Sequence, residues 1–148
     1  MTAQIRKIMV PTDFSDASDS ALSYAASMAR DSGASLYLLH VVRDQAGYHG
    51  ARERLALLAD RFAAGVPRVA TEVRDGDPAE SIAEAVLHHG ADLVVMATHA
   101  RTGLSHLLSG SVAETLIRVA ACPVLVLRGT VPVPVEQFET ETVPAVQA

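Results

Sequence analysis

The chain has very few cysteine and aromatic residues, so neither disulfides nor large rings can carry its fold. Among 148 residues there is one cysteine, no tryptophan, and an aromatic fraction of 4%. A single cysteine cannot form an internal disulfide, and no spacing of cysteine and histidine indicates a zinc site. We interpret Cys122, which precedes Pro123 at the start of an apolar run, as a buried core residue. Alanine, valine and leucine must therefore fill most of the core.

The sequence also lacks an excess of positive charge and any long apolar stretch. Its formal net charge is −5 and its pI is near 5.6, so no basic stripe offers a surface for nucleic acid, and we expect no binding to DNA or RNA. No apolar stretch approaches the ~20 residues of a membrane span. The apolar run after Arg6 and Lys7 is too short for a signal peptide. We therefore expect a cytoplasmic protein with no membrane partner.

Five short runs rich in β-branched and aliphatic residues are predicted to be strands. Most are nearly continuous in apolar residues, as strands are when helices cover both faces of a parallel sheet. The third run alternates instead, with Val69, Thr71 and Val73 on one side, which is typical of an edge strand. The runs are Ile5–Val10, Ser35–Val42, Arg68–Val73, Leu93–Ala97 and Val124–Leu127.

Segments with helical spacing of apolar residues separate these runs. The first ends before Gly33, where a positive φ costs glycine little. The third opens with Asp77 and Pro78 and has Glu80 in its first turn, and the fourth pairs Ser111 with Glu114, both in the pattern of a capping box. The predicted helices are Ser15–Ser32, Ala51–Ala64, Asp77 to Gly90, and Ser111 to about Ala121.

The alternation of strands and helices predicts an α/β fold with one parallel sheet and right-handed crossovers. Ligands of such sheets bind beyond the carboxyl ends of the strands, where the strand order reverses. Three segments lie there, Pro11–Ser15, Val41–Arg43 and Ala97–Ser111. We expect one domain over residues 1–128. Gly129–Ala148, with three prolines, three glutamates and no basic residue, is interpreted as a mobile tail, or alternatively as an arm that adds to a partner subunit.

The segment Pro11-Thr12-Asp13-Phe14-Ser15 joins the first strand to the first helix, and its polar side chains have two interpretations. Asp13 could accept hydrogen bonds from a sugar hydroxyl or a base amine of a ligand. Alternatively, Asp13 or Ser15 caps the helix that follows. The sequence leaves both interpretations open.

The loop from Ala97 to Ser111 is a candidate anion site, because it ends at the start of a helix. A helix N-terminus offers free N–H donors and a partial positive charge. Thr98 and His99 add donors, and Arg101 could pair bidentately with a phosphate. Ser111 could cap its own helix at the same time. The loop has neither a Walker A sequence nor a GxGxxG sequence.

Six histidines do not form a recognisable metal or catalytic pattern. No pair of them has the i, i+4 spacing of metal ligands together with a carboxylate partner. The sequence also has no Gly-x-Ser-x-Gly elbow for a nucleophilic serine. We therefore expect no metal ligands and no catalytic residues.

Four segments between about Arg6 and Arg128 resemble, in order, the universal stress protein family. They are KIMVPTDFS, LYLLHVV, GDPAESIAEAV and ADLVVMATHARTGLSHLLSGSVAETLIRVAACPVLVLR. The resemblance implies a Rossmann-like, doubly wound parallel sheet of five strands in the order 3-2-1-4-5, similar to adenine nucleotide α-hydrolases. It also implies a homodimer through the last strand, here Pro123–Arg128, an edge otherwise open to unwanted pairing.

The resemblance further implies an ATP site. In nucleotide-binding members, adenosine is held near the ends of the first and second strands, here Pro11, Thr12, Asp13 and Val41. The phosphates lie on the loop after the fourth strand and the helix that follows it, with Mg²⁺ on the ligand rather than in a protein cage. The corresponding residues here are Met96, Ala97, Thr98, His99, Ala100, Arg101, Gly110, Ser111 and Val112.

The chain departs from the family's ATP pattern, which is Gly, two residues, Gly, nine residues, then Gly followed by Ser or Thr. Ala97 and Ala100 stand at the two leading glycine positions, and only Gly110-Ser111 matches. Alanine at position 97 costs little if that residue belongs to a strand. If position 100 needs a positive φ, alanine there costs about 1 kcal/mol. A loss of about 1–2 kcal/mol weakens affinity roughly ten- to thirtyfold without abolishing the site.

Three functions follow as hypotheses. The first is a dimeric stress-response protein that binds ATP and acts as a regulatory module, with at most slow hydrolysis. The second is a nucleotide-free interaction protein, which the two alanines favour. The third is an enzyme related to the adenine nucleotide α-hydrolases, which would need a second substrate pocket that a chain of 148 residues does not visibly supply.

Overall fold

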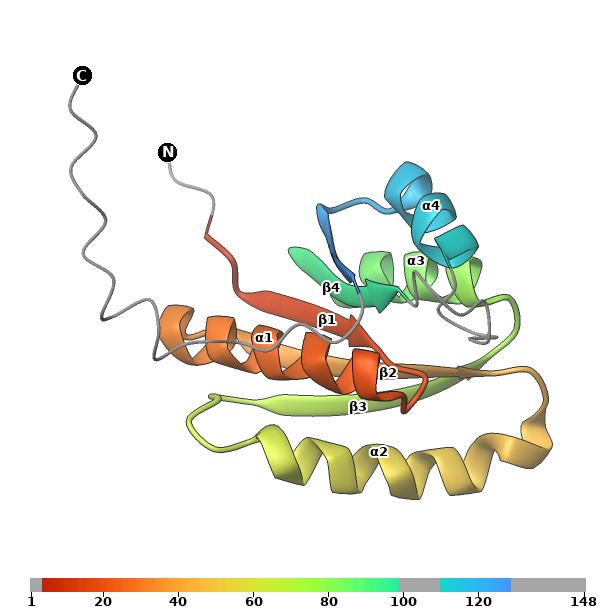
Figure 1. Ribbon diagram of the computed structural model, residues 1–148, viewed down its shortest axis with the longest axis horizontal. Coiled ribbons are helices and arrows are strands. Elements are labelled where there is room, and N and C mark those ends of the chain that lie inside the picture. The colour runs from red at the N-terminus through yellow and green to blue at the C-terminus, as the bar shows by residue number, and fades with distance from the viewer. Residues whose placement is uncertain (1–3, 99–109, 129–148) are drawn as a thin grey trace.

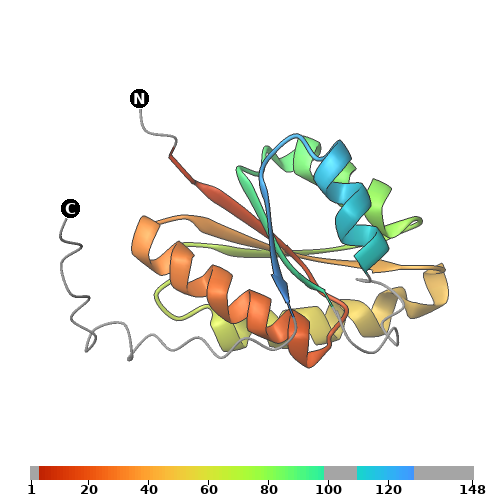
Figure 2. The ribbon, with the colours of Figure 1, turned by 45° about the horizontal axis from the view of Figure 1, so that its top comes forward.

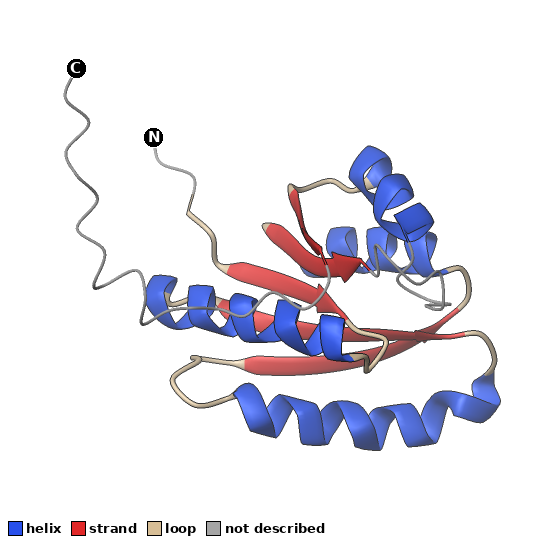
Figure 3. Cartoon of the chain, viewed as in Figure 1, coloured by secondary structure: helices blue, strands red, loops and turns tan. Residues whose placement is uncertain are grey.

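Strands and helices alternate along the whole described chain of the computed structural model, which covers residues 4–98 and 110–128 (Figure 3). This alternation confirms the predicted order of elements. The elements are β1 (Lys7–Pro11), α1 (Asp16–Ser32), β2 (Ser35–Val42), the 3-10 turn η1 (Gln45–Gly47), α2 (Tyr48–Phe62), β3 (Val69–Asp75), α3 (Pro78–His89), β4 (Leu93–Thr98), α4 (Gly110–Val119) and β5 (Val124–Arg128).

The five strands form one parallel sheet in the order β3-β2-β1-β4-β5. Helices α1 and α2 cover one face, and α3 and α4 cover the other (Figure 1). The predicted doubly wound architecture and strand order are therefore confirmed. Strand β3 lies at an edge of the sheet, as predicted. Its burial does not alternate as expected, because Val73 is buried whereas Thr71, on the same predicted face, is exposed.

Two layers of apolar side chains, one on each face of the sheet, form the core. On the first face, α1 lies close to the strands because its inner surface is lined by small residues, and larger residues such as Leu22 and Leu55 fill the remaining space. On the second face, Ile82 of α3 and Leu116 of α4 pack over Met9 and Met96. Strand β4 is buried along its entire length, as expected for a central strand. The buried alanines of α1 are Ala17, Ala21, Ala25, Ala26 and Ala29.

Helix boundaries follow the predicted capping residues at α1 and α3. Ser15 is the N-cap of α1, and its Oγ accepts a hydrogen bond from the backbone N–H of Ser18 at 3.2 Å. Asp77 is the N-cap of α3, and its Oδ2 accepts from Glu80 N–H at 3.0 Å. Gly33 ends α1 with a φ of 75°, a conformation in which a side chain would be strained.

Most element boundaries differ from the sequence prediction by one to three residues, and α2, α4 and β1 are three such cases. Helix α2 begins at Tyr48, three residues earlier than predicted, because the 3-10 turn η1 leads directly into it. Asp44 caps η1, and its Oδ1 accepts a hydrogen bond from the backbone N–H of Ala46. Helix α4 already includes Gly110, so Ser111 lies within its first turn, and it ends at Val119. Strand β1 extends through Pro11, which pairs with Leu39 of β2.

Candidate functional site at the carboxyl edge of the sheet

The strand order reverses at β1, which lies between β2 and β4. Pairing of β1 with β2 continues to Pro11↔Leu39, and Thr12 N–H then donates to the Leu39 carbonyl at 2.8 Å. Pairing of β1 with β4 stops earlier, at Met9↔Val94. Along a parallel strand, the backbone groups of successive residues point alternately to the two neighbouring strands. Because Thr12 points to β2, the nitrogen of Pro11 points to β4, and a proline nitrogen has no hydrogen to donate. Proline thus ends the β1–β4 ladder at the switch point.

The turn from Thr12 to Ser15 follows directly and is held by its own side chains. Asp13 Oδ1 accepts from the backbone N–H of Ser15 at 2.9 Å and from Ser18 Oγ at 2.8 Å. Thr12 Oγ1 accepts from Phe14 N–H at 3.0 Å. Of the two capping residues considered, Ser15 is the cap, while Asp13 fixes the turn in front of it. Its carboxylate therefore has a defined position at the end of β1.

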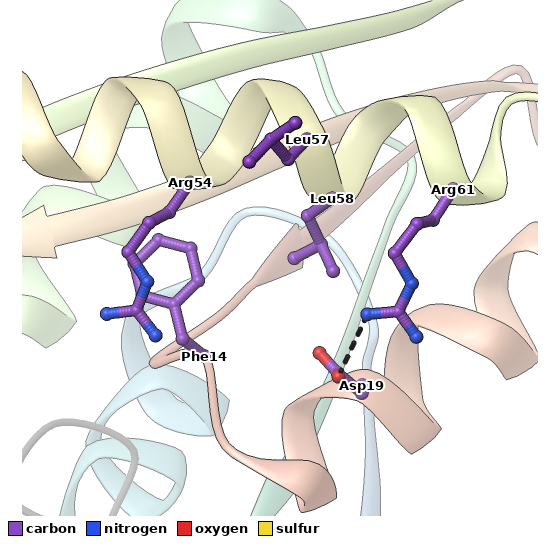
Figure 4. Close-up of a pocket in the computed structure, with 6 residues that line it drawn as sticks. All are labelled: Phe14, Asp19, Arg54, Leu57, Leu58 and Arg61. Carbon is purple, nitrogen blue, oxygen red and sulfur yellow. Dashed lines mark ion pairs between the residues drawn. The ribbon is translucent and has the colours of Figure 1, made fainter.

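Phe14 adopts a φ of 65°, which is rare for a bulky side chain, and its ring contacts both His40 and Arg54. The ring centroid of His40 lies 4.5 Å from that of Phe14. The guanidinium carbon of Arg54, on α2, lies 4.2 Å from the Phe14 centroid (Figure 4). The ring of this turn is thus held by contacts from both β2 and α2.

His40 lies beneath the turn and holds its backbone. Its Nδ1 is 2.7 Å from the carbonyl oxygen of Thr12, and since a carbonyl only accepts, Nδ1 carries the hydrogen. Burial lowers the pKa of His40 below its ordinary 6.5, and the positive charge of Arg54 lowers this pKa further. The hydrogen bond to Thr12 and the negative charge of Asp13 act in the opposite direction. The neutral imidazole is therefore the form that fits the folded protein.

Several residues predicted to bind a ligand turn out to be core residues. Met96 is fully buried among the α3/α4 core, and Ala97, 1% exposed, packs on the α1 side. Val41 is 6% exposed and packs in the α3/α4 core as well. Met96 and Ala97 can therefore contribute to a site mainly through their backbone. Thr98, at the last position of β4, is also mostly buried.

Helix α4 begins at the same end of the sheet (Figure 2). Ser111 lies in its first turn, where its carbonyl accepts a bond from Thr115 Oγ1 at 2.9 Å, and Val112 is half-buried against the core. The predicted phosphate residues His99, Ala100 and Arg101 lie outside the described residues, as does the predicted tail 129–148. Of the predicted phosphate residues, the structure therefore describes those at the end of β4 and in the first turn of α4.

Sequence reasoning missed His40, Phe14 and Arg54 as parts of this region. A signal for His40 appears only once the register of β1 and β2 is known. Since Pro11 pairs with Leu39, the next residues along each strand, Thr12 and His40, must also lie side by side. Arg54 gave no such signal, because only tertiary packing brings α2 against the β1–α1 turn.

Among residues 4–98 and 110–128, no group of three or more His, Cys, Asp or Glu side chains is placed to hold a metal ion. Cys122 was expected to be buried but is only half-buried. Burial raises the pKa of its thiol, and the negative charge of Asp92 raises this pKa further, whereas a hydrogen bond with the Val94 backbone lowers it. Within the same described part, no helix has the length and apolar character to cross a bilayer.

The fold and this edge of the sheet define an open, doubly wound α/β protein with a polar turn at its switch point. The model of the universal stress protein family matches residues 4–128. The chain therefore belongs to the universal stress protein family, as the sequence motifs predicted.

Two universal stress proteins are similar to this chain in sequence. The chain is 35% identical over 143 residues to universal stress protein MJ0531 of Methanocaldococcus jannaschii, a match that covers 83% of this chain and 82% of the relative. It is 32% identical over 142 residues to universal stress protein G of Shigella flexneri, covering 83% of this chain and 99% of that protein.

Solved structures show the same fold. Universal stress protein UspA from Lactobacillus plantarum superposes with a TM-score of 0.75 and 26% identity, covering 86% of this chain and 100% of that chain. A universal stress protein solved in complex with cAMP superposes with a TM-score of 0.69 and 28% identity, covering 86% and 99% of the two chains. The second protein binds an adenine nucleotide.

Proposed function

We propose that this protein is a regulatory module of the stress response that binds an adenine nucleotide, with ATP as the physiological ligand. The observation that carries the proposal is the Thr12–Ser15 turn at the switch point, where Asp13 is held in place by Ser15 and Ser18. A preorganised carboxylate accepts hydrogen bonds from an exocyclic amine or a ribose hydroxyl without being ordered first. The 28% identical relative in complex with cAMP supports the same class of ligand.

The residues present fit such a ligand at both ends. Pro11 and Val41 lie at the ends of adjacent strands, where a base would rest against their backbone, since both side chains are buried. The first turn of α4, at Gly110 and Ser111, supplies backbone N–H groups and the positive end of a helix dipole for phosphates. Mg²⁺ would arrive on the phosphates and neutralise part of their charge, as it commonly does when the protein offers few ligands of its own.

The alanine at position 97 is compatible with this proposal. Ala97 lies inside β4, and it is not among the described residues that have a positive φ. Its conformation is one that alanine adopts without strain, and its side chain packs in the core. The cost of replacing the family's leading glycines therefore depends on Ala100 alone.

Isothermal titration calorimetry with ATP–Mg²⁺, and separately with cAMP, tests the proposal. Asp13→Asn keeps an oxygen that can hold the turn but removes the charge, and we expect about tenfold weaker binding, or about 1.4 kcal/mol. Asp16→Asn, an exposed aspartate in the first turn of α1, is the matched control and should bind as the natural protein does. Absence of binding by the natural protein at millimolar ATP and cAMP would contradict the proposal.

We also propose that the protein acts as a homodimer through β5. The apolar residues of this strand, Val124 to Leu127, are only partly buried in the single chain. Strand β5 lies at the edge of the sheet, with no further strand beside it among the described residues. Val119, at the end of α4, is 55% exposed and adds apolar surface just before this strand. A second copy pairing with this edge would bury these side chains and close the open ladder.

A nucleotide-free interaction protein is the second candidate, and the replacement of both leading glycines by Ala97 and Ala100 favours it. Under this alternative the dimer surface would still form, whereas neither nucleotide would bind. The calorimetric experiment therefore separates the two candidates. A cytoplasmic location and the absence of a nucleic-acid partner stay predictions.

A further inference from the structure

A hollow of about 210 Å³ lies between the start of α1 and α2, and Phe14 of the β1–α1 turn belongs to its lining (Figure 4). Its apolar lining comes from Phe14, Leu57 and Leu58. Leu57 is 67% exposed, so the hollow leaves apolar surface open to water. The volume is below the range of about 300–1,000 Å³ typical of sites for small molecules. It suits a single inserted side chain better than a nucleotide.

Two arginines flank this apolar floor. Arg54 and Arg61 lie seven residues apart on α2, so they project from the same face of the helix as Leu57 and Leu58. Arg61 Nη1 is 3.6 Å from Asp19 Oδ2. Arg54 stacks on Phe14 and forms no ion pair with any described carboxylate. The hollow therefore offers one cation whose charge is not matched by a neighbouring acid.

Aspartates limit how an acidic segment could approach. Asp19 lines the hollow, and burial raises its pKa, with Asp16 and Asp13 adding to the rise and Arg61 opposing it. These three acids lie at the start of α1, so they repel negative charge on that side. The favourable place for a carboxylate is the α2 side, at Arg54.

The C-terminal tail carries a matching sequence. The chain has six phenylalanine and tyrosine residues, and Phe138 is the one that lies in the segment 129–148. Glu136 precedes it by two residues and Glu139 follows it, in a stretch that contains no basic residue. An aromatic ring flanked by carboxylates complements an apolar hollow flanked by guanidinium groups.

The tail is long enough to reach. Arg128 pairs with Thr98 of β4, and β1 is the next strand beyond β4, so the end of β5 lies two strand spacings, about 10 Å, from the β1–α1 turn that carries Phe14. Ten residues separate Phe138 from Arg128. At about 3.1 Å per residue in an extended, proline-containing segment, they span about 30 Å. That length also covers the additional layer of α1 and α2 above the sheet.

We propose that the tail segment Val135–Glu141 docks on this hollow of its own chain, with Phe138 inserted between Phe14 and Leu57 and a flanking glutamate paired with Arg54. The docked ring removes Leu57 and the face of Phe14 from water. It also links the tail to the turn that positions Asp13, because Phe14 belongs to that turn.

The absence of tryptophan makes a direct test possible, because Phe138→Trp introduces the sole tryptophan of the 148-residue chain. We expect its emission to be blue-shifted and protected from acrylamide, relative to a peptide of residues 129–148 with the same substitution. Adding Leu57→Glu, at an exposed helix position whose change leaves the core intact, should return both signals to those of the peptide. Leu87→Glu, on α3 at a 70% exposed leucine, is the matched control and should change neither.

A charge exchange tests the ion pair. Arg54→Glu should release the tryptophan, and combining it with Glu136→Arg and Glu139→Arg should restore the blue shift. Emission identical to that of the free peptide in the Phe138→Trp protein would overturn the proposal. An equal response to Leu57→Glu and Leu87→Glu, or a blue shift that disappears on dilution and so reports the tail of a second copy, would overturn it as well.

Discussion

His40 donates a hydrogen bond from Nδ1 to the carbonyl oxygen of Thr12 at 2.7 Å, joining the end of β2 to the turn after β1. The same ring stacks on Phe14, whose positive φ makes the turn possible. A strand histidine thus positions the turn that carries Asp13, without itself lying at the surface, since it is 7% exposed. The proposed nucleotide site consequently depends on a residue that need not touch the ligand.

The first prediction concerns pH. Because the pKa of His40 is lowered from 6.5 in the folded protein, the unfolded chain binds more protons as the pH falls below that value. The stability that His40 provides is therefore complete above pH 6.5 and is lost as the pH falls toward the folded pKa, by at most about 1.4 kcal/mol per pH unit.

Urea unfolding at about pH 7.5 and about pH 5.5 measures this effect. His40→Phe keeps an aromatic ring but cannot titrate, so it should be less stable at neutral pH by about 1–3 kcal/mol, because the Thr12 carbonyl loses its partner. It should also lose less stability than the natural protein between the two pH values. An unchanged pH dependence in the variant would show that His40 is not the group responsible.

The second prediction concerns acid stability at the other edge of the sheet. Glu72 on β3 accepts from Arg74 Nε at 2.8 Å and lies 2.6 Å from His89 Nε2 on α3. Burial raises the pKa of Glu72, but the hydrogen bonds with His89 and Arg74 outweigh it, and the net pKa is below 4.5. The stability from Glu72 is therefore present above pH 4.5 and is lost as the pH falls through the folded pKa.

Glu72→Gln should reduce stability at neutral pH by about 1 kcal/mol, a modest value because the side chain is about one-third exposed. It should also flatten the loss of stability below pH 4.5 that chemical denaturation records. Glu84→Gln is the control: this carboxylate is 74% exposed and 3.7 Å from Arg74, so its removal should have little effect. Equal effects of the two substitutions would argue against a special role for Glu72.

The third prediction separates helix capping from ligand binding. Ser15→Ala removes the N-cap of α1 and should lower the free energy of unfolding by about 1 kcal/mol. Ser20→Ala, on the second turn of the same helix, should be neutral or slightly stabilising, because alanine is the better helix former. Thermal or urea unfolding of both variants decides the point. A larger loss for Ser20→Ala would be inconsistent with the cap.

The fourth prediction concerns the dimer. Val94 N–H donates to the Pro123 carbonyl, so by alternation the backbone N–H of Val126 faces away from β4. Val126→Pro should therefore spare the β4–β5 ladder but block pairing with a second copy. Light scattering after size-exclusion chromatography should show a monomer for Val126→Pro and a dimer for Val126→Ala. Finding both variants dimeric would place the interface elsewhere.

Local patterns in the sequence determined the elements and their order. Continuous apolar runs marked the strands, Ser15 and Asp77 marked helix starts, and Gly33 marked a helix end. Such features depend on residues close together in the chain, so the sequence alone can predict them. Most boundaries shifted by one to three residues, and β1 extends through Pro11 because that residue pairs with Leu39, which is distant in sequence.

Tertiary structure decided which of the predicted site residues have an exposed side chain. The sequence motif assigned Met96 and Ala97 to the phosphate-binding segment. Both lie in β4, an inner strand of the sheet, so their side chains are buried in the core. Arg54 and His40 come from different elements, and only the packing of α2 and β2 against the β1–α1 turn brings them to Phe14. The sequence thus determined the strand-to-helix turn that carries Asp13, whereas the side chains that hold it came from contacts that no local pattern encodes.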